Sequence, residues 1–333
     1  MNDGSFLFGV EIELFLGSRK QKNPTFKSLA EEVNKRLTKA GIANHIKASN
    51  DKSASKYRKW SLVQEVSIPP SHDHYGIELV SPIYPATATS RWQSDLTTIF
   101  ATLHKHFLIA PSPKCSTHIH LSGTPVPLSA GELAALAKTV LYFEPALDRL
   151  MPAGRRSNSE SYWCQSNRCS PPLAGLSLGE CLARLDEAAA TPGSGDAGVE
   201  RVVECMNLVS ADSPLGRVRR MQAHESFLHG KVYKWNFTGV TPGGGGTGTV
   251  EFRQPGGCVT AGDATAWIVL TLAFAVGAMS VGPGLGEGGV WPGAGESLDE
   301  LEWVLEIGRE ALGWGELVGV GELFARAETE GMY

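Results

Sequence analysis

The chain has 333 residues, of which 42% are hydrophobic and 20% are charged, so it can bury a large core and does not have the composition of a disordered segment. Its net charge of −5 argues against a nucleic-acid-binding protein, which normally carries a basic surface. The six cysteines form no CxxC pair, and the N-terminus has no signal-peptide pattern, so we expect reduced thiols in a cytoplasmic protein.

Hydrophobic periodicity predicts a mixed order of strands and helices along the chain. Strands are expected at 5–16, 58–68, 76–80, 116–122, 231–239 and 247–253. Helices are expected at 25–41, 87–107, 129–150, 178–190, 264–281, 298–312 and 315–330. Because strands and helices do not alternate regularly, this order favours an α+β fold, with an antiparallel sheet backed by helices, over a doubly wound parallel sheet.

The predicted helix at 264–281 has no charged residue and reaches the lower length limit for a membrane span. It contains Thr and Ser, and it lacks the basic anchors that usually flank a span. We therefore expect a helix buried in the protein core, and no membrane partner.

Inside the predicted strands, polar side chains recur at positions i and i+2, which point to the same face of a strand. These residues are Glu11 with Glu13, Glu65 with Ser67, His118 with His120, Glu251 with Arg253, and the single Glu78. A solvent-exposed sheet face explains any one pair, but such faces usually carry Lys, Thr, Ser or Gln. Together they predict a face that holds divalent cations, because so many carboxylates repel one another.

The residue types also indicate which cation the site would bind and which reaction it would catalyse. Oxygen ligands with one or two imidazoles suit Mg²⁺ or Mn²⁺, whereas sites of His alone or of Cys and His suit Zn²⁺. Arg253 shares a face with Glu251, and Arg155, Arg156 and Arg168 lie in the polar segment GRRSNSESYWCQSNR. Metal-binding carboxylates beside an arginine that can grip phosphate are typical of phosphoryl transfer, although Arg155 and Arg156 also fit an ordinary basic loop.

Seven motifs occur in an order that resembles the amidoligase family. They are GVEIEL, WSLVQEVSI, GIELVSP, CSTHIHLS, NSESYWC, YKWNF and TVEFRQPGG, between about residues 6 and 280. The family belongs to the carboxylate–amine ligase superfamily, with glutamine synthetase and glutamate–cysteine ligase. The resemblance implies a glutamine synthetase-like fold, in which a curved antiparallel sheet forms a half-barrel or funnel. We expect the chain to divide into three parts. Residues 1–281 would form the catalytic domain, 282–296 a Gly/Pro-rich linker, and 297–333 C-terminal helices that pack on the same domain.

The resemblance also implies an activity. A carboxylate attacks the γ-phosphate of ATP to give an acyl phosphate, and an amine or ammonia then displaces phosphate to form an amide or isopeptide bond. The implied cofactors are ATP and two divalent metals, Mg²⁺ or Mn²⁺. The implied partners are a small-molecule or peptide carboxylate and an amine, and peptide modification, a secondary-metabolite amide and an ammonia-using reaction are all compatible with it.

Matched position by position, the resemblance implies a role for each residue of the strand motifs. The metal ligands would be Glu11, Glu13, Glu78, His118 and Glu251. Arg253 would contact the transferring phosphate or the substrate carboxylate, and His120 would face phosphate or substrate. Asn236, in YKWNF, would lie near the nucleotide or the substrate.

Two further positions carry alternatives. Either Arg155 or Arg156 would match a family arginine that binds the nucleotide phosphates. Glu65 stands where the family usually has Asp. If that position orients the incoming amine, the longer side chain bears on which amine is used.

Two other functions fit the same residues. A zinc hydrolase would use His118, His120 and the glutamates to hold one zinc ion, and it would turn over without ATP. A non-catalytic descendant of the amidoligase fold would only bind a ligand, and we would expect it to have lost site residues. The paired glutamates and Arg253 favour the ligase.

Overall fold

The computed structural model describes most of the chain. The described residues are 5–20, 23–47, 57–71, 73–87, 90–156, 163–192, 195–208, 231–243, 247–289 and 293–330. Residues 158–162 of the NSESYWC motif and residues 244–246 of the glycine-rich loop lie outside them.

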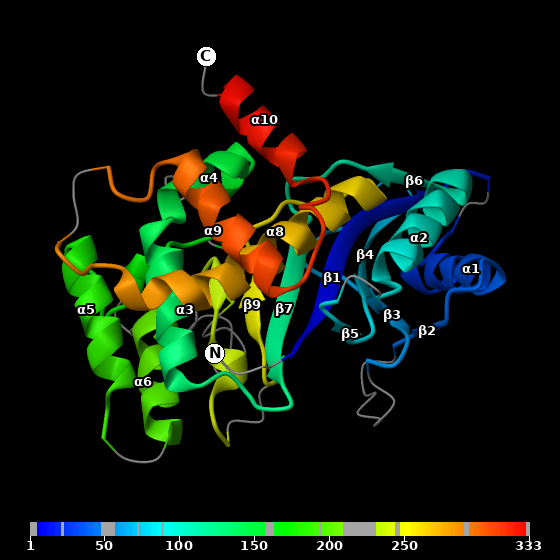
Figure 1. Cartoon of the computed structure of the whole chain (residues 1–333). Coiled ribbons are helices and arrows are strands. Elements are labelled where there is room, and N and C mark those ends of the chain that lie inside the picture. Colours follow the sequence, from blue (N-terminus) through cyan, green and yellow to red (C-terminus); the bar gives the residue numbers. More distant parts are fainter. Residues whose placement is uncertain are drawn as a thin grey trace.

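Within these residues, nine strands form one open sheet around the long strand β1 (Figure 1). Along the sheet the order is β2-β3-β4-β1-β7-β9-β8, with every pair antiparallel except β2 with β3. The strands are β1 Ser5–Ser18, β2 Asn44–Ile46, β3 Trp60–Gln64, β4 His74–Val80, β5 Tyr84–Pro85, β6 Phe107–Ala110, β7 Thr117–Thr124, β8 Trp235–Asn236 and β9 Val250–Phe252. The predicted antiparallel sheet is thus confirmed, and the likeness to the glutamine synthetase fold stays a prediction.

β1 is long enough to pair with two strands on each side. β4 and β5 share one edge of it, and β7 and β6 share the other. The sequence analysis missed β2, β5 and β6, because two to four residues are too few to show a period of two. The expected helix at 87–107 is wrong at both ends, since α2 begins at Trp92 and the segment after His106 pairs with β1 as β6.

Helices cover the apolar face of the sheet and form a second group beside it (Figure 1). They are α1 Phe26–Lys39, α2 Trp92–His106, α3 Ala130–Tyr142, α4 Glu144–Leu150, α5 Leu178–Ala189, α6 Gly195–Asn207, α8 Ala261–Val281, α9 Leu298–Ala311 and α10 Val320–Glu330. Val10, Ile12 and Leu14 of β1 are buried in the same core as these helices. The opposite face of β1 therefore carries Glu11 and Glu13.

The helix predicted at 129–150 is two helices. Ser129 caps α3 in a capping box with Glu132, but the helix is interrupted at Phe143. Pro145 explains the break, because proline has no N–H to donate and its ring clashes with the preceding turn.

The sequence analysis did not predict α6, because the start of this segment is rich in Gly and Ser and is typical of a surface loop. Its apolar residues Val199, Val202, Val203 and Met206 follow helical spacing and are buried. Two glycines in the segment lower its helix propensity, so packing against α3 and α5 stabilises it. The periodicity alone could have revealed this helix.

α8 is a core helix, as the sequence predicts. By length and composition, Ala261–Gly284 is the one segment among the described residues that could cross a membrane. However, 83% of its most apolar window is buried inside the protein. Its apolar character is therefore explained by its contacts with β7, α2, α3 and α9.

Two glycines bring α8 and α9 into close contact. A Cβ at Gly308 would lie 1.8 Å from the carbonyl oxygen of Ala273, and one at Gly277 would lie 2.1 Å from that of Val304. Neither position tolerates a side chain unless the two helix backbones move apart.

We expect Gly308→Ala to lower the free energy of unfolding by about 1–3 kcal/mol, because the added methyl group overpacks this contact. Urea denaturation measures the change. Gly131→Ala is the matched control, since Gly131 is also helical but has nothing within 4 Å of its missing Cβ. Equal stability of the two variants would show that α8 and α9 can separate at no cost.

Candidate functional site

Strand register brings the polar residues of β1, β4, β7 and β9 onto one face of the sheet. Glu13 lies opposite Glu78 of β4, and Glu11 lies opposite His118 of β7. Glu251 of β9 lies opposite His120 on one side and Asn236 of β8 on the other. Side chains directly opposite one another in a sheet are close enough to interact, so four strands build one cluster.

Three sets of side chains in this cluster could each hold a cation. The sets are Glu11 with Glu78 and His118, Glu11 with His120 and Glu251, and Glu13 with Glu65 and Glu78. Within each set, the ligand atoms lie within 4.8 Å of one another. The sets contain all five residues expected as metal ligands, and they add His120 and Glu65.

His120 supplies an independent sign that the cluster fits a cation. Its Nε2 atom is buried and has no hydrogen-bond partner among the described residues. It lies 3.4 Å from Glu11 Oε1 and 3.7 Å from Glu251 Oε1, while its Nδ1 lies 3.2 Å from Thr249 Oγ1. A buried nitrogen that faces two carboxylates without a hydrogen bond is suited to ligate a metal ion.

The protonation states point the same way. Burial, reinforced by the charges of Glu11 and Glu13, raises the pKa of Glu78 to about 9. Burial also acts to raise the pKa of Glu251, but the charges of Arg253 and the two histidines outweigh it and bring that pKa to about 2. Without a cation, the cluster therefore keeps a proton on Glu78 at neutral pH.

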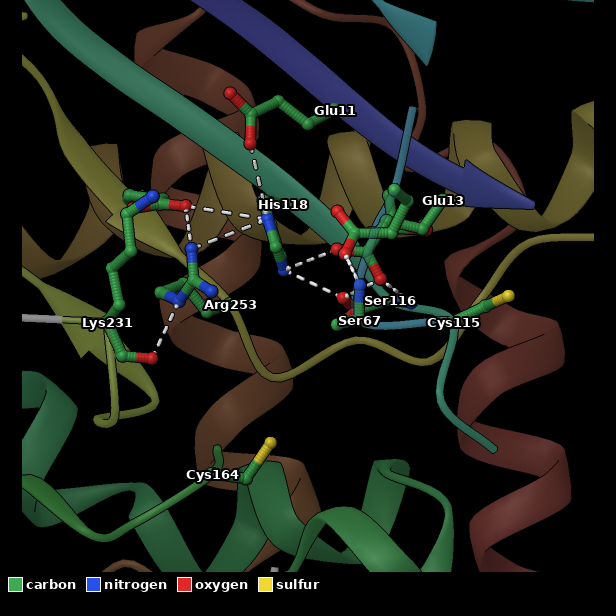
Figure 2. A network of polar contacts seen from close by, with 12 residues as sticks. Glu11, Glu13, Ser67, Cys115, Ser116, His118, Cys164, Lys231 and Arg253 are labelled. Atoms are coloured by element: carbon green, nitrogen blue, oxygen red, sulfur yellow. Dashed lines mark hydrogen bonds and ion pairs between the residues drawn. The ribbon is translucent and has the colours of Figure 1, made fainter. Parts of the chain in front are cut away.

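Ser116 orients both Glu13 and His118 (Figure 2). Its backbone N–H and its hydroxyl donate to Glu13 Oε2 at 2.8 and 2.6 Å, and the hydroxyl lies 2.8 Å from His118 Nε2. Because the hydroxyl proton goes to Glu13, the hydroxyl oxygen accepts from His118 Nε2–H. In the neutral form of His118, the nitrogen with the free lone pair is therefore Nδ1. This atom lies 3.3 Å from Glu11 Oε2 and 3.5 Å from Glu251 Oε1. The sequence analysis missed Ser116, although it stands two residues before His118 and so shares its face.

Arg253 is held in a fixed orientation. Its Nη1 pairs with Glu251 Oε1, and its Nε donates to the carbonyl oxygen of Lys231 at 3.1 Å (Figure 2). Asn236 donates to the other oxygen of Glu251 at 2.9 Å, and its own carbonyl accepts from the backbone and hydroxyl of Thr238. The amide of Asn236 therefore serves to position Glu251.

The short strand β8 depends on two asparagines that the sequence analysis did not single out. Asn167 exchanges two hydrogen bonds with the backbone of Trp235, as a neighbouring strand would do. Asn207 donates to the same carbonyl and accepts from the N–H of Phe237. These buried amides tie the helical part of the chain to the strand that carries Asn236.

A buried ion pair reinforces this connection. The ammonium of Lys234 donates to Glu144 at 2.7 Å and to Asp148 at 2.5 Å, both on α4. The carbonyl of Lys234 accepts from the N–H of Arg253 at 2.8 Å. Glu251 and Arg253 are thus positioned from α4 through β8.

Two cavities flank the cluster. The charged cavity, of about 250 Å³, is lined by Glu11, Glu13, Glu65 and Glu78 together with four basic side chains. Those basic residues are Lys114, Arg155, Lys231 and Arg253. The second cavity, of about 130 Å³, lies beyond Glu11 and His120. Apolar and aromatic residues form much of its wall, including Phe8, Tyr57, Val80 and Ile83, and Thr247 and Thr249 add hydroxyl groups.

The three candidate arginines lie in different places. Arg155 lines the charged cavity and donates to the carbonyl oxygens of Arg253 and Cys115, each at 3.2 Å. Arg156 instead donates to the carbonyl oxygen of Met151, and Arg168 donates to that of Leu176. The structure therefore brings Arg155 to the site.

Glu65 reaches the charged cavity from a turn. The strand expected at 58–68 is wrong beyond Gln64, where β3 ends. Glu65 Oε1 accepts from the N–H of Ser67 at 2.7 Å, so these two residues do not share a strand face. Gly76 permits the turn, because a Cβ there would lie 2.5 Å from the carbonyl oxygen of Glu65.

Cys115, near the site, is not placed as a nucleophile. Cys115 points away from His118 in Figure 2, and burial raises the pKa of its thiol to about 11. A thiol of this kind has almost no thiolate at neutral pH.

Comparison with known families supports the resemblance to the amidoligase family. Residues 5–169 match the sequence model of the family described as "Putative amidoligase enzyme". This segment carries the first-strand glutamates, Glu78 and both histidines, and it ends before Glu251. A search of curated proteins gave no match.

The proton on Glu78 makes stability depend on pH. The pKa of Glu78 is about 9 in the folded protein and has an ordinary value of 4.5, so the folded state binds more protons between these values. In buffer without divalent cations, we therefore expect the Glu78 contribution to stability to be complete below about pH 4.5 and to fall as the pH rises to about 9. Mg²⁺ should raise the melting temperature more at about pH 8.5 than at about pH 6, because the ion competes with the proton.

Thermal unfolding at several pH values, with and without Mg²⁺, measures both effects. Glu78→Gln is the control, since it removes the titrating carboxyl and should flatten the pH dependence. An Mg²⁺ effect of the same size at both pH values would contradict the assignment of this proton.

Proposed function

Residues 5–169 belong to the amidoligase family, and from this we propose that the protein is an ATP-dependent carboxylate–amine ligase that works through an acyl phosphate. One observation carries the proposal. Glutamates and histidines from separate segments of the sheet form three overlapping sets that could hold cations, beside the fixed guanidinium of Arg253. Phosphoryl transfer depends mainly on positioning and on stabilising charge, and this cluster provides groups for both.

The donor chemistry supports two Mg²⁺ or Mn²⁺ ions. In each set, carboxylates outnumber imidazoles, which favours hard cations over Zn²⁺. Glu11, His120 and Glu251 would hold one ion, and Glu13 and Glu78 would hold the other, with His118 between them. Bound there, the ions would offset the charge that develops on the transferred phosphoryl group.

We assign the two cavities to the two substrates of the first step. The apolar walls beyond Glu11 and His120 suit the adenine of ATP, and Thr247 and Thr249 suit its phosphates. The charged cavity suits the acid, because its basic side chains can hold a carboxylate. Arg253 lies beside the cluster, where it can contact the γ-phosphate or the acid.

The reaction then needs no side-chain nucleophile. An oxygen of the substrate carboxylate bonds to the γ-phosphorus, and the bond to the bridging oxygen breaks to release ADP. The amine nitrogen bonds to the acyl carbon, phosphate leaves, and the amine loses a proton. Glu65 lines the charged cavity, and we assign to it the orientation of the amine.

The decisive experiment measures ADP release with Mg²⁺ and pools of carboxylic acids, using hydroxylamine to trap the acyl phosphate as a hydroxamate. The ligase requires that ADP and hydroxamate appear together and only when an acid is present. Substrate hydrolysis without ATP, with zinc retained after dialysis, would instead establish the hydrolase. No nucleotide binding and no turnover would establish a ligand-binding descendant.

Glu251→Gln should lower ADP release by at least about 100-fold, because it removes a metal-ligand charge while keeping the size of the side chain. Glu302→Gln, on an exposed position of α9, is the matched control and should keep full activity. Circular dichroism checks that both variants fold. Normal turnover by Glu251→Gln would remove Glu251 from the metal site.

Arg253→Lys should lower kcat/KM by about 100-fold even though it keeps the positive charge. Lysine cannot bind Glu251 and the Lys231 carbonyl while also presenting a planar fork to phosphate. Steady-state kinetics and a thermal melt separate lost catalysis from lost folding. Rates close to wild type in this variant would give Arg253 a purely structural role.

A further inference from the structure

A third cavity, which we call the apolar groove, adjoins the charged cavity. It has a volume of about 360 Å³. Its walls include the apolar side chains of Phe15, Ala110, Pro111, Pro113, Pro152 and Val259. Glu13 and Arg155 line both this groove and the charged cavity, so the two spaces are neighbours.

The groove continues the polar face of the sheet. Phe15 follows Glu13 by two residues on β1, so both point to the same side of the sheet. Ala110 of β6 lies opposite Phe15 in the register, so it continues this apolar surface onto the neighbouring strand. Beyond Glu13, the face that bears the cation ligands therefore becomes apolar.

Charge complementarity indicates what the two spaces receive. Once cations offset the glutamates of the charged cavity, its basic side chains favour a carboxylate, whereas Glu13 and Arg155 are the charged residues that line the groove. Both of these stand where the groove meets the charged cavity. A molecule whose carboxylate lies among the basic residues would extend its remaining atoms along uncharged walls.

We propose that the acid substrate carries an apolar group, of the size of a branched aliphatic or aromatic side chain, next to its reacting carboxylate, and that the apolar groove binds this group. The inference rests on the proposed ligase activity and names its substrate class. An apolar α-amino acid and a peptide with an apolar C-terminal residue present this same chemistry.

The test measures hydroxamate formation at saturating Mg²⁺ and ATP, with hydroxylamine as the amine. One arm compares leucine and phenylalanine with serine and aspartate. The other compares glycyl-leucine and glycyl-phenylalanine with glycyl-serine and glycyl-aspartate. We expect KM to be at least about tenfold lower for the apolar acids than for the polar ones. The arm in which turnover occurs shows whether the substrate carboxylate belongs to a free amino acid or to a peptide.

Val259→Asp places a charge on the wall of the groove at a residue that is 37% exposed. It should raise KM for the apolar acids by about tenfold or more and leave KM for serine unchanged. Val318→Asp is the matched control, because Val318 is 39% exposed and is not among the residues that line the groove. It should change neither value.

The outcomes separate this inference from the ligase proposal. Turnover that favours polar acids, or an unchanged ratio of KM values in Val259→Asp, would overturn the groove assignment while the ligase stands. ADP release and hydroxamate absent with every acid, together with no binding of Mg²⁺ and ATP, would overturn both.

Discussion

Mutual repulsion among carboxylates on one buried sheet face is the constraint on which the rest of the site depends. Two like charges 4 Å apart repel by about 4 kcal/mol at an effective dielectric constant near 20. The protein offsets this for Glu251 with Arg253, and for Glu11 with the histidines. Glu78 instead shares its surroundings with other glutamates, and its pKa rises to about 9. A divalent cation bound among these carboxylates would offset this repulsion.

Such a cluster has to be held together by the surrounding fold. β1 sits at the centre of the sheet and pairs with strands on both edges, so its glutamates cannot shift without breaking several ladders. On the far side, β8 and β9 are short, and short strands contribute little rigidity. There the rigidity comes from the hydrogen bonds of Asn167 and Asn207 to β8, and from the buried contacts of Lys234 with α4. The helical part of the chain thereby sets the position of Glu251 and Arg253.

The sequence reveals much of this cluster because strand periodicity is a local property. Alternation alone predicts that Glu11 and Glu13 share a face, and the same rule covers His118 with His120. The register that sets Glu11 against His118 depends on contacts between distant segments, so no local pattern contains it. The choice of Arg155 over Arg156 likewise depends on carbonyl groups that only the folded chain presents. Pro145 could have located the break between α3 and α4, whereas β2, β5 and β6 are too short for any pattern.

Burial explains why this arrangement suits the proposed chemistry. His118, Glu251 and Arg253 are each at most 9% exposed, so their interactions are screened far less than those of surface charges. An acyl phosphate reacts readily with water, and a ligase has to keep water away until the amine arrives. In the proposed ligase, apolar walls on both sides of the cluster would serve that purpose, because they would leave little for water to bind once substrates fill the cavities. The same burial that makes the carboxylates costly would therefore also protect the acyl phosphate of the proposed reaction.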